Sequence, residues 1–146
     1  MKKILLLGLI IMLIILSCAM QESKFPQGTW NLVSWKSISG GTVVGELSST
    51  FSGSDMVIFS ESYFLSVGRF KQDTTFMNNG VGAKYTINGN HCEETLLYFP
   101  NQDNVGSKVK STLELRNDTL VKTYPVNDNW EIDKSNYTVE KYVRVN

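Results

Sequence analysis

The chain has 146 residues, and its 14 basic residues balance its 14 acidic residues. Without the two lysines at the N-terminus, 12 basic residues remain against 14 acidic ones, a net charge of −2. A domain with this charge lacks the basic surface that nucleic-acid binding requires, so we expect no nucleic-acid partner. The length suits one domain with its own core and is too short for two.

The N-terminus has the pattern of an export signal. Two lysines follow Met1, and an uninterrupted apolar run extends from Ile4 to Leu16. As a helix, this run would span roughly 20 Å at about 1.5 Å per residue, which is less than the hydrocarbon core of about 30 Å. The sequence therefore predicts a cleaved signal rather than a transmembrane anchor.

The apolar run stops at a cysteine, and Ile15-Leu16-Ser17-Cys18 resembles the bacterial lipobox. That resemblance implies a signal peptide over 1–17, acylation of Cys18, and a lipidated N-terminus and tether over 18–26. Two or three acyl chains would hold the protein stably on a membrane. We expect it in the cell envelope, with the outer membrane favoured because Ala19 and Met20 replace the aspartate that retains many lipoproteins at the inner membrane. The alternative is an ordinary signal peptide that happens to contain a cysteine.

From residue 27 to residue 146 the pattern is that of an antiparallel all-β domain. Val, Thr, Tyr, Phe and Trp are frequent, and turn residues recur about every ten positions. Gly28–Trp35 predicts a first strand, with Trp30 and Leu32 on one face and Val33 and Trp35 on the other. The Gly/Ser-rich residues 37–54 predict a flexible loop or lid with at most a short strand around 42–47.

The remaining segments predict seven more strands joined by tight turns. Asn88-Gly89 suits a two-residue hairpin turn, as does Asn117-Asp118, and a polar loop is expected at 78–80. Eight or nine strands in sequential order favour an up-and-down barrel over a sandwich, because closure removes the exposed edges. The predicted strands cover 56–60, 63–70, 83–87, 91–99, 108–116, 119–126 and 136–145.

Several segments resemble the lipocalin-like domain common in exported proteins of Bacteroidetes. GTWNLVSW, at Gly28–Trp35, resembles the G-x-W opening strand, and MVIFSESYFLSV, GVGAKYTINGN, HCEETLLYF and VEKYVRV follow in the same order. The resemblance covers about Gly28 to Val145 and implies a calycin-type barrel. It also implies that Arg144 lies across the indole of Trp30 and closes the barrel by a cation–π contact.

The same resemblance implies an interior that could hold a ligand. The family tends to carry a tyrosine and an inward-facing acid in one strand, at the positions of Cys92 and Glu94. Ser66 and Gly68 leave space beside Phe64, so a cavity is expected. Its predicted ligand-binding residues are Phe64, Tyr85, Glu94, Tyr98 and Tyr142. The alternative is that these aromatic side chains fill the barrel.

Period-two alternation places further charges inside. Glu140 and Arg144 share a face of the last strand, so we expect Arg144 to pair with Glu140 or Glu94. His91 and Cys92 are adjacent on a strand and point to opposite faces, which disfavours a metal site. With one histidine in the chain and no Ser/His/Asp arrangement, the sequence indicates no catalytic residues and no cofactor.

Two functions follow as hypotheses. The first is a membrane-tethered lipocalin-like protein that binds a small hydrophobic or amphipathic molecule. The second is a filled barrel that serves as an interaction or structural module, with the 37–54 segment and the Trp130 loop as contact surfaces. An enzyme that uses Glu94 inside the barrel has the least support.

Overall fold

The computed structural model describes residues 25–145. The predicted signal peptide and Cys18 lie outside the described residues. The nine strands are β1 (Gly28–Ser39), β2 (Thr42–Glu46), β3 (Phe51–Phe59), β4 (Tyr63–Gln72), β5 (Thr75–Asn88), β6 (His91–Tyr98), β7 (Lys108–Arg116), β8 (Thr119–Tyr124) and β9 (Tyr137–Arg144). A single 3-10 turn, η1 (Gln102–Asn104), precedes β7. None of the described segments is a helix long and apolar enough to cross a membrane.

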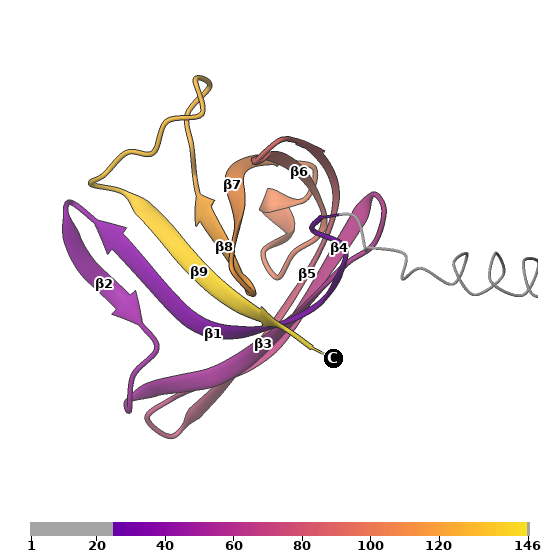
Figure 1. Ribbon diagram of the computed structural model, residues 1–146. Coiled ribbons are helices and arrows are strands. Elements are labelled where there is room, and N and C mark those ends of the chain that lie inside the picture. Colours follow the sequence, from indigo (N-terminus) through magenta and orange to yellow (C-terminus); the bar gives the residue numbers. More distant parts are fainter. Residues whose placement is uncertain (1–24, 146) are drawn as a thin grey trace, which may run out of the picture.

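All nine strands form one antiparallel sheet that closes on itself (Figure 1). Strands β3 to β9 follow one another in sequence order, and β9 returns to pair with β1. On its other edge β1 pairs with β3 near its start and with β2 near its end. Eight strands therefore make the closed barrel and β2 is an additional strand. The prediction of an all-β, antiparallel, lipocalin-like barrel of about eight or nine strands is confirmed.

One end of the barrel, here called the floor, is closed by side chains. It carries the start of β1 and the turns that follow β3, β5 and β7. The guanidinium carbon of Arg144 lies 4.3 Å from the ring centroid of Trp30, which is buried, and the indole Nε1 donates to the carbonyl of Pro26 at 2.9 Å. Arg144 also donates to the carbonyl of Gln27 at 3.0 Å. The predicted closing contact between the first and last strands is therefore present.

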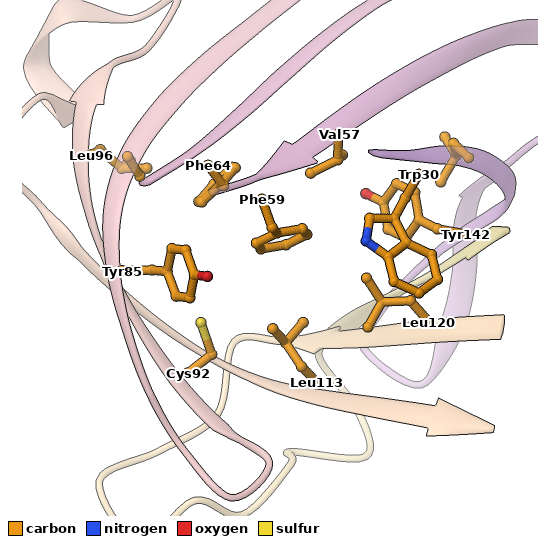
Figure 2. Packing of buried hydrophobic residues seen from close by; sticks show 12 residues of the cluster. Trp30, Val57, Phe59, Phe64, Tyr85, Cys92, Leu96, Leu113, Leu120 and Tyr142 are labelled. Carbon is orange, nitrogen blue, oxygen red and sulfur yellow. The ribbon is translucent and has the colours of Figure 1, made fainter. Parts of the chain in front are cut away.

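The hydrophobic core lies inside the barrel above this floor. Phe59 is at its centre, with ring centroids 5.6 Å from Phe64 and 5.5 Å from Tyr85. Figure 2 shows the labelled core side chains projecting from the strands towards a common interior. Alternating positions on each strand bury one face, as a barrel with a single core requires. The buried apolar cluster contains Trp30, Leu32, Val57, Phe59, Phe64, Ala83, Tyr85, Cys92, Leu96, Leu113, Leu120 and Tyr142.

Two predicted loops are wrong. The segment 37–54 is mostly strand: β1 continues to Ser39, β2 (Thr42–Glu46) matches the short strand expected around 42–47, and β3 begins at Phe51. Gly40 and Gly41 have φ values of 57° and 77°, the left-handed geometry that a two-residue hairpin turn needs. Residues 78–80 are also strand, paired with 67–69 of β4. The turn between β4 and β5 comes earlier, at Asp73, whose φ is 53°.

Two irregularities change which side chains face inwards. The pairing of β1 with β9 shifts between Leu32 and Ser34, and the pairing of β5 with β6 shifts between Gly82 and Ala83. One extra residue reverses the alternation beyond it. Trp35 therefore shares the interior with Leu32, contrary to the prediction, and Tyr98 lies on the outside with 72% of its surface exposed.

Candidate ligand-binding cavity

The end of the barrel opposite the floor, here called the mouth, leads to an internal cavity of about 670 Å³. Ligand pockets in proteins are typically clefts of roughly 300–1,000 Å³ with apolar walls and a few polar groups. The apolar wall is built by Leu32, Val57, Phe59, Phe64, Val81, Leu96, Phe99, Val109 and Leu120.

Three aromatic side chains line the cavity near the mouth. Phe51 stacks on Phe70 with ring centroids 5.5 Å apart and planes 3° apart, and it contacts Trp35 with centroids at 5.5 Å. Phe51 is the first residue of β3 and Phe70 faces it from β4, so the hairpin places both beside the entrance. This arrangement supplies a flat apolar surface for part of a ligand.

A buried ion pair inside the barrel joins β6 to β8, across β7. Lys122 Nζ is 2.7 Å from Glu94 Oε1 and 3.0 Å from Oε2, and only 2% of the Glu94 side chain is exposed. Burial acts to lower the pKa of Lys122, but the carboxylates of Glu94 and Glu140 outweigh it and raise that pKa. Lys122 therefore stays protonated, and its charge is directed at Glu94.

Glu140 is held by hydroxyl groups. Tyr124 donates to its Oε1 at 2.8 Å and Tyr142 donates to its Oε2 at 2.7 Å. Burial raises the pKa of Glu140, and the Lys122 charge and the two hydroxyls offset part of that rise. The pKa values of both tyrosines are well above the usual value because of burial and the Glu140 charge. Both tyrosines thus remain hydrogen-bond donors at neutral pH.

Asp55 is the third carboxylate of the cavity, and it comes from β3. Its Oδ2 accepts hydrogen bonds from the Ser66 hydroxyl at 2.7 Å and the Asn79 amide at 3.2 Å. Its Oδ1 is buried and accepts no hydrogen bond from any described residue. Burial raises the pKa of Asp55, although the Ser66 and Asn79 bonds, the backbone N–H of Met56 and the charge of Lys122 act against the rise.

The predicted site residues divide into three groups. Phe64, Glu94 and Tyr142 line the cavity. Tyr85 is buried in the core but does not line the cavity, and its hydroxyl donates to the carbonyl of Ser60 at 2.7 Å. Tyr98 does not line the cavity, because the irregularity in β6 turns it outwards, where its ring covers Gly82.

The predicted pairing of Arg144 with Glu140 or Glu94 is also wrong. Arg144 lies over Trp30 at the floor, and Lys122 takes the place of the expected partner of Glu94. Lys122 was not among the predicted site residues, although it alternates with the buried Leu120. Asp55 was not among them either; it alternates with Val57 and Phe59 but precedes the predicted start of that strand.

Three features outside the cavity bear on the other hypotheses. Burial and the charge of Glu94 raise the pKa of the Cys92 thiol to about 12, so Cys92 is protonated and a poor nucleophile at neutral pH.

The Trp130 ring stacks on His91 with centroids 4.2 Å apart, so it packs on the barrel wall. Among the described residues, no group of three or more His, Cys, Asp or Glu side chains is arranged to hold a metal ion.

Comparison of the chain with known protein families, with curated proteins and with solved structures found no match. The case for a function therefore depends on the geometry of the cavity.

Proposed function

We propose that this protein is a membrane-tethered, lipocalin-like lipoprotein whose barrel binds a small hydrophobic or amphipathic molecule in the cell envelope. The observation that carries the proposal is the internal cavity of about 670 Å³. Its walls are largely apolar, and Asp55, Lys122 and Glu140 converge on it from three different strands. A few polar groups in an apolar enclosure fix the orientation of a ligand and give specificity.

The test is binding of the neutral fluorophore N-phenyl-1-naphthylamine to residues 19–146, which contain all nine strands and the complete core. Val81 lines the cavity, and Val67 is exposed on the outer face of β4. We expect saturable binding to one site, abolished by Val81→Trp and unaffected by Val67→Trp. Circular dichroism would confirm that both variants fold. Absent binding, or equal binding by both variants, would overturn the proposal.

The alternative is an interaction module that works through the outer surface. Exposed apolar side chains face each other across β3 and β4, Met56 opposite Val67 and Ile58 opposite Leu65. An exposed apolar patch can mark an interaction site. This alternative predicts no saturable uptake of the fluorophore, so the same titration separates the two functions.

The membrane tether requires its own experiment, because Cys18 lies outside the described residues. Full-length protein expressed with an alkyne-labelled fatty acid should become labelled and partition with membranes. Cys18→Ser should lose both the label and the membrane association. A labelled Cys18→Ser protein, or an unlabelled wild type, would contradict the proposed anchor.

A further inference from the structure

The charges that line the cavity do not balance. They comprise three carboxylates, Asp55, Glu94 and Glu140, and one ammonium group, Lys122. Lys122 approaches both oxygens of Glu94, at 2.7 Å and 3.0 Å. Within the described part of the chain, neither Asp55 nor Glu140 forms an ion pair. The cavity therefore contains more acid than its own cation can match.

Asp55 also has an unused acceptor. The residue is 5% exposed, and Oδ2 takes both of its side-chain hydrogen bonds, from Ser66 and Asn79. Oδ1 is left without a partner among the described residues although it is buried. Buried polar atoms are nearly always paired in folded proteins, so such an atom in a cavity wall calls for an external donor. Asp55 lines the cavity, so a ligand there lies beside this carboxylate.

The same arrangement disfavours an anionic ligand. A carboxylate ligand would need Lys122 as its cation, and Lys122 already forms an ion pair with Glu94. A ligand carboxylate would add a fourth negative charge to a buried space, where an unpaired charge is costly. A cation would instead reduce the excess of acid, and an ammonium group brings three hydrogen-bond donors.

On the basis of the proposed function, we infer that the ligand is an amphipathic amine. Its apolar body packs against Phe64, Leu96 and the aromatic residues near the mouth, and its protonated nitrogen donates a hydrogen bond to Asp55 Oδ1. Glu140 adds a second negative charge in the cavity, and each of its oxygens already accepts one hydroxyl hydrogen bond, from Tyr124 or Tyr142. We assign Asp55 Oδ1 as the direct contact because it has no side-chain hydrogen bond.

The test compares dodecylamine, dodecanol and dodecanoate, which share one tail and differ in the head group. Each is titrated calorimetrically into residues 19–146 at pH 7. We expect dodecylamine to bind about tenfold or more tightly than dodecanol, since only the ammonium group brings a positive charge that offsets the excess of carboxylates in the cavity. Dodecanoate should bind most weakly. Dodecyltrimethylammonium, a cation without an N–H donor, should bind more weakly than dodecylamine.

Asp55→Asn isolates the contact, because an amide retains both hydrogen bonds at Oδ2 but removes the charge and the acceptor at Oδ1. We expect dodecylamine affinity to fall by about tenfold to a hundredfold, as for loss of a hydrogen bond to a charged group. Dodecanol affinity should fall by a smaller factor than dodecylamine affinity, because the alcohol loses a hydrogen bond but no attraction between opposite charges. Asp118→Asn, at an exposed turn, is the matched control and should change neither.

The outcomes separate the inference from the proposed function. Dodecanoate binding as tightly as dodecylamine would overturn the amine inference and leave the binding function standing. An unchanged dodecylamine affinity in Asp55→Asn, or equal binding of the quaternary cation, would overturn the assigned contact. If none of the four probes binds, both the inference and the binding function fail.

Discussion

The carboxyl group of Asp55 is buried, and only one of its two oxygens accepts side-chain hydrogen bonds. Its backbone position in β3 faces the interior, and Gly68 opposite it offers no side chain that could donate a hydrogen bond. Ser66 and Asn79 satisfy one oxygen and leave the other unpaired among the described residues. A buried, incompletely paired carboxyl group costs stability, and titratable groups of this kind cluster at functional sites.

The first prediction concerns the pH dependence of stability. The unfolded pKa of aspartate is about 3.9, and burial raises the pKa of Asp55 in the fold. Between those two pKa values the folded state binds more protons than the unfolded state, so the contribution of Asp55 to stability falls as pH rises. Asp55→Asn should therefore be at least as stable as wild type at pH 7 and show a flatter pH profile.

Urea unfolding of residues 19–146 at several pH values between 4 and 8 would measure this profile, with Asp118→Asn as the control. A variant that is less stable than wild type at pH 7, with the wild-type pH dependence intact, would show that Asp55 stabilises the fold.

The second prediction concerns Cys92, which is fully buried. Because burial and Glu94 raise its pKa to about 12, the thiolate is scarce at pH 8. Residues 19–146 contain no other cysteine, so Ellman's reagent should not react with the native fragment. It should react stoichiometrically in urea. A fast native reaction whose rate does not change with urea would show that Cys92 is accessible.

At the scale of the strands, regular alternation could be predicted from the sequence but its interruptions could not. Trp30, Leu32 and Glu94 were placed on the correct face because they precede the pairing shifts of their strands, and Phe64 because the pairing of β3 with β4 is regular. Beyond the pairing shifts in β1 and β6, the alternation of inward and outward side chains is reversed. Trp35 and Phe99 therefore line the cavity and Tyr98 does not. An extra residue in one strand depends on the pairing partner, which a single strand's sequence does not contain.

The third prediction tests the hairpin near the mouth. Gly53 in β3 has a φ of 156°, and a Cβ there would lie 2.6 Å from the Phe70 Cα. Gly53→Ala should therefore destabilise the protein by about 1–3 kcal/mol or more, because the neighbour is backbone. At Gly80 a Cβ would meet nothing within 4 Å, so Gly80→Ala should be neutral or stabilise by about 0.4–1 kcal/mol.

Urea unfolding of both alanine variants would measure the difference between the two glycines. Equal effects would mean that β3 and β4 are not packed as closely near the mouth as the structure has them.

The fourth prediction tests closure by β1 and β9. Trp30 and Arg144 face each other in the register, and the guanidinium carbon is 4.3 Å from the ring centroid. A double-mutant cycle with Trp30→Leu and Arg144→Met should give a coupling energy of about 0.5–2 kcal/mol. A coupling below about 0.3 kcal/mol would make the two residues independent and contradict the stacked contact.

At the scale of the whole molecule, the barrel combines a sealed floor, a wide interior and a charged wall. The closed sheet could be predicted because strand length, turn residues and strand order determine it locally, whereas the Trp30–Arg144 contact at the floor was predicted only from the resemblance to the lipocalin-like domain. The sequence did not predict that Lys122 rather than Arg144 neutralises Glu94, since that choice depends on how β6, β8 and β9 are placed around the barrel. Ion pairs across strands that are distant in sequence are properties of the closed structure.

The central claim is that the barrel holds a small molecule, and native mass spectrometry tests it most directly. Full-length protein purified from the cells that make it would be measured under native and denaturing conditions, so that a covalent anchor can be distinguished from a bound ligand. We predict one additional small mass per chain that is lost on denaturation, absent from Val81→Trp and retained in Val67→Trp. A native mass equal to the denatured mass in all three proteins would contradict the claim.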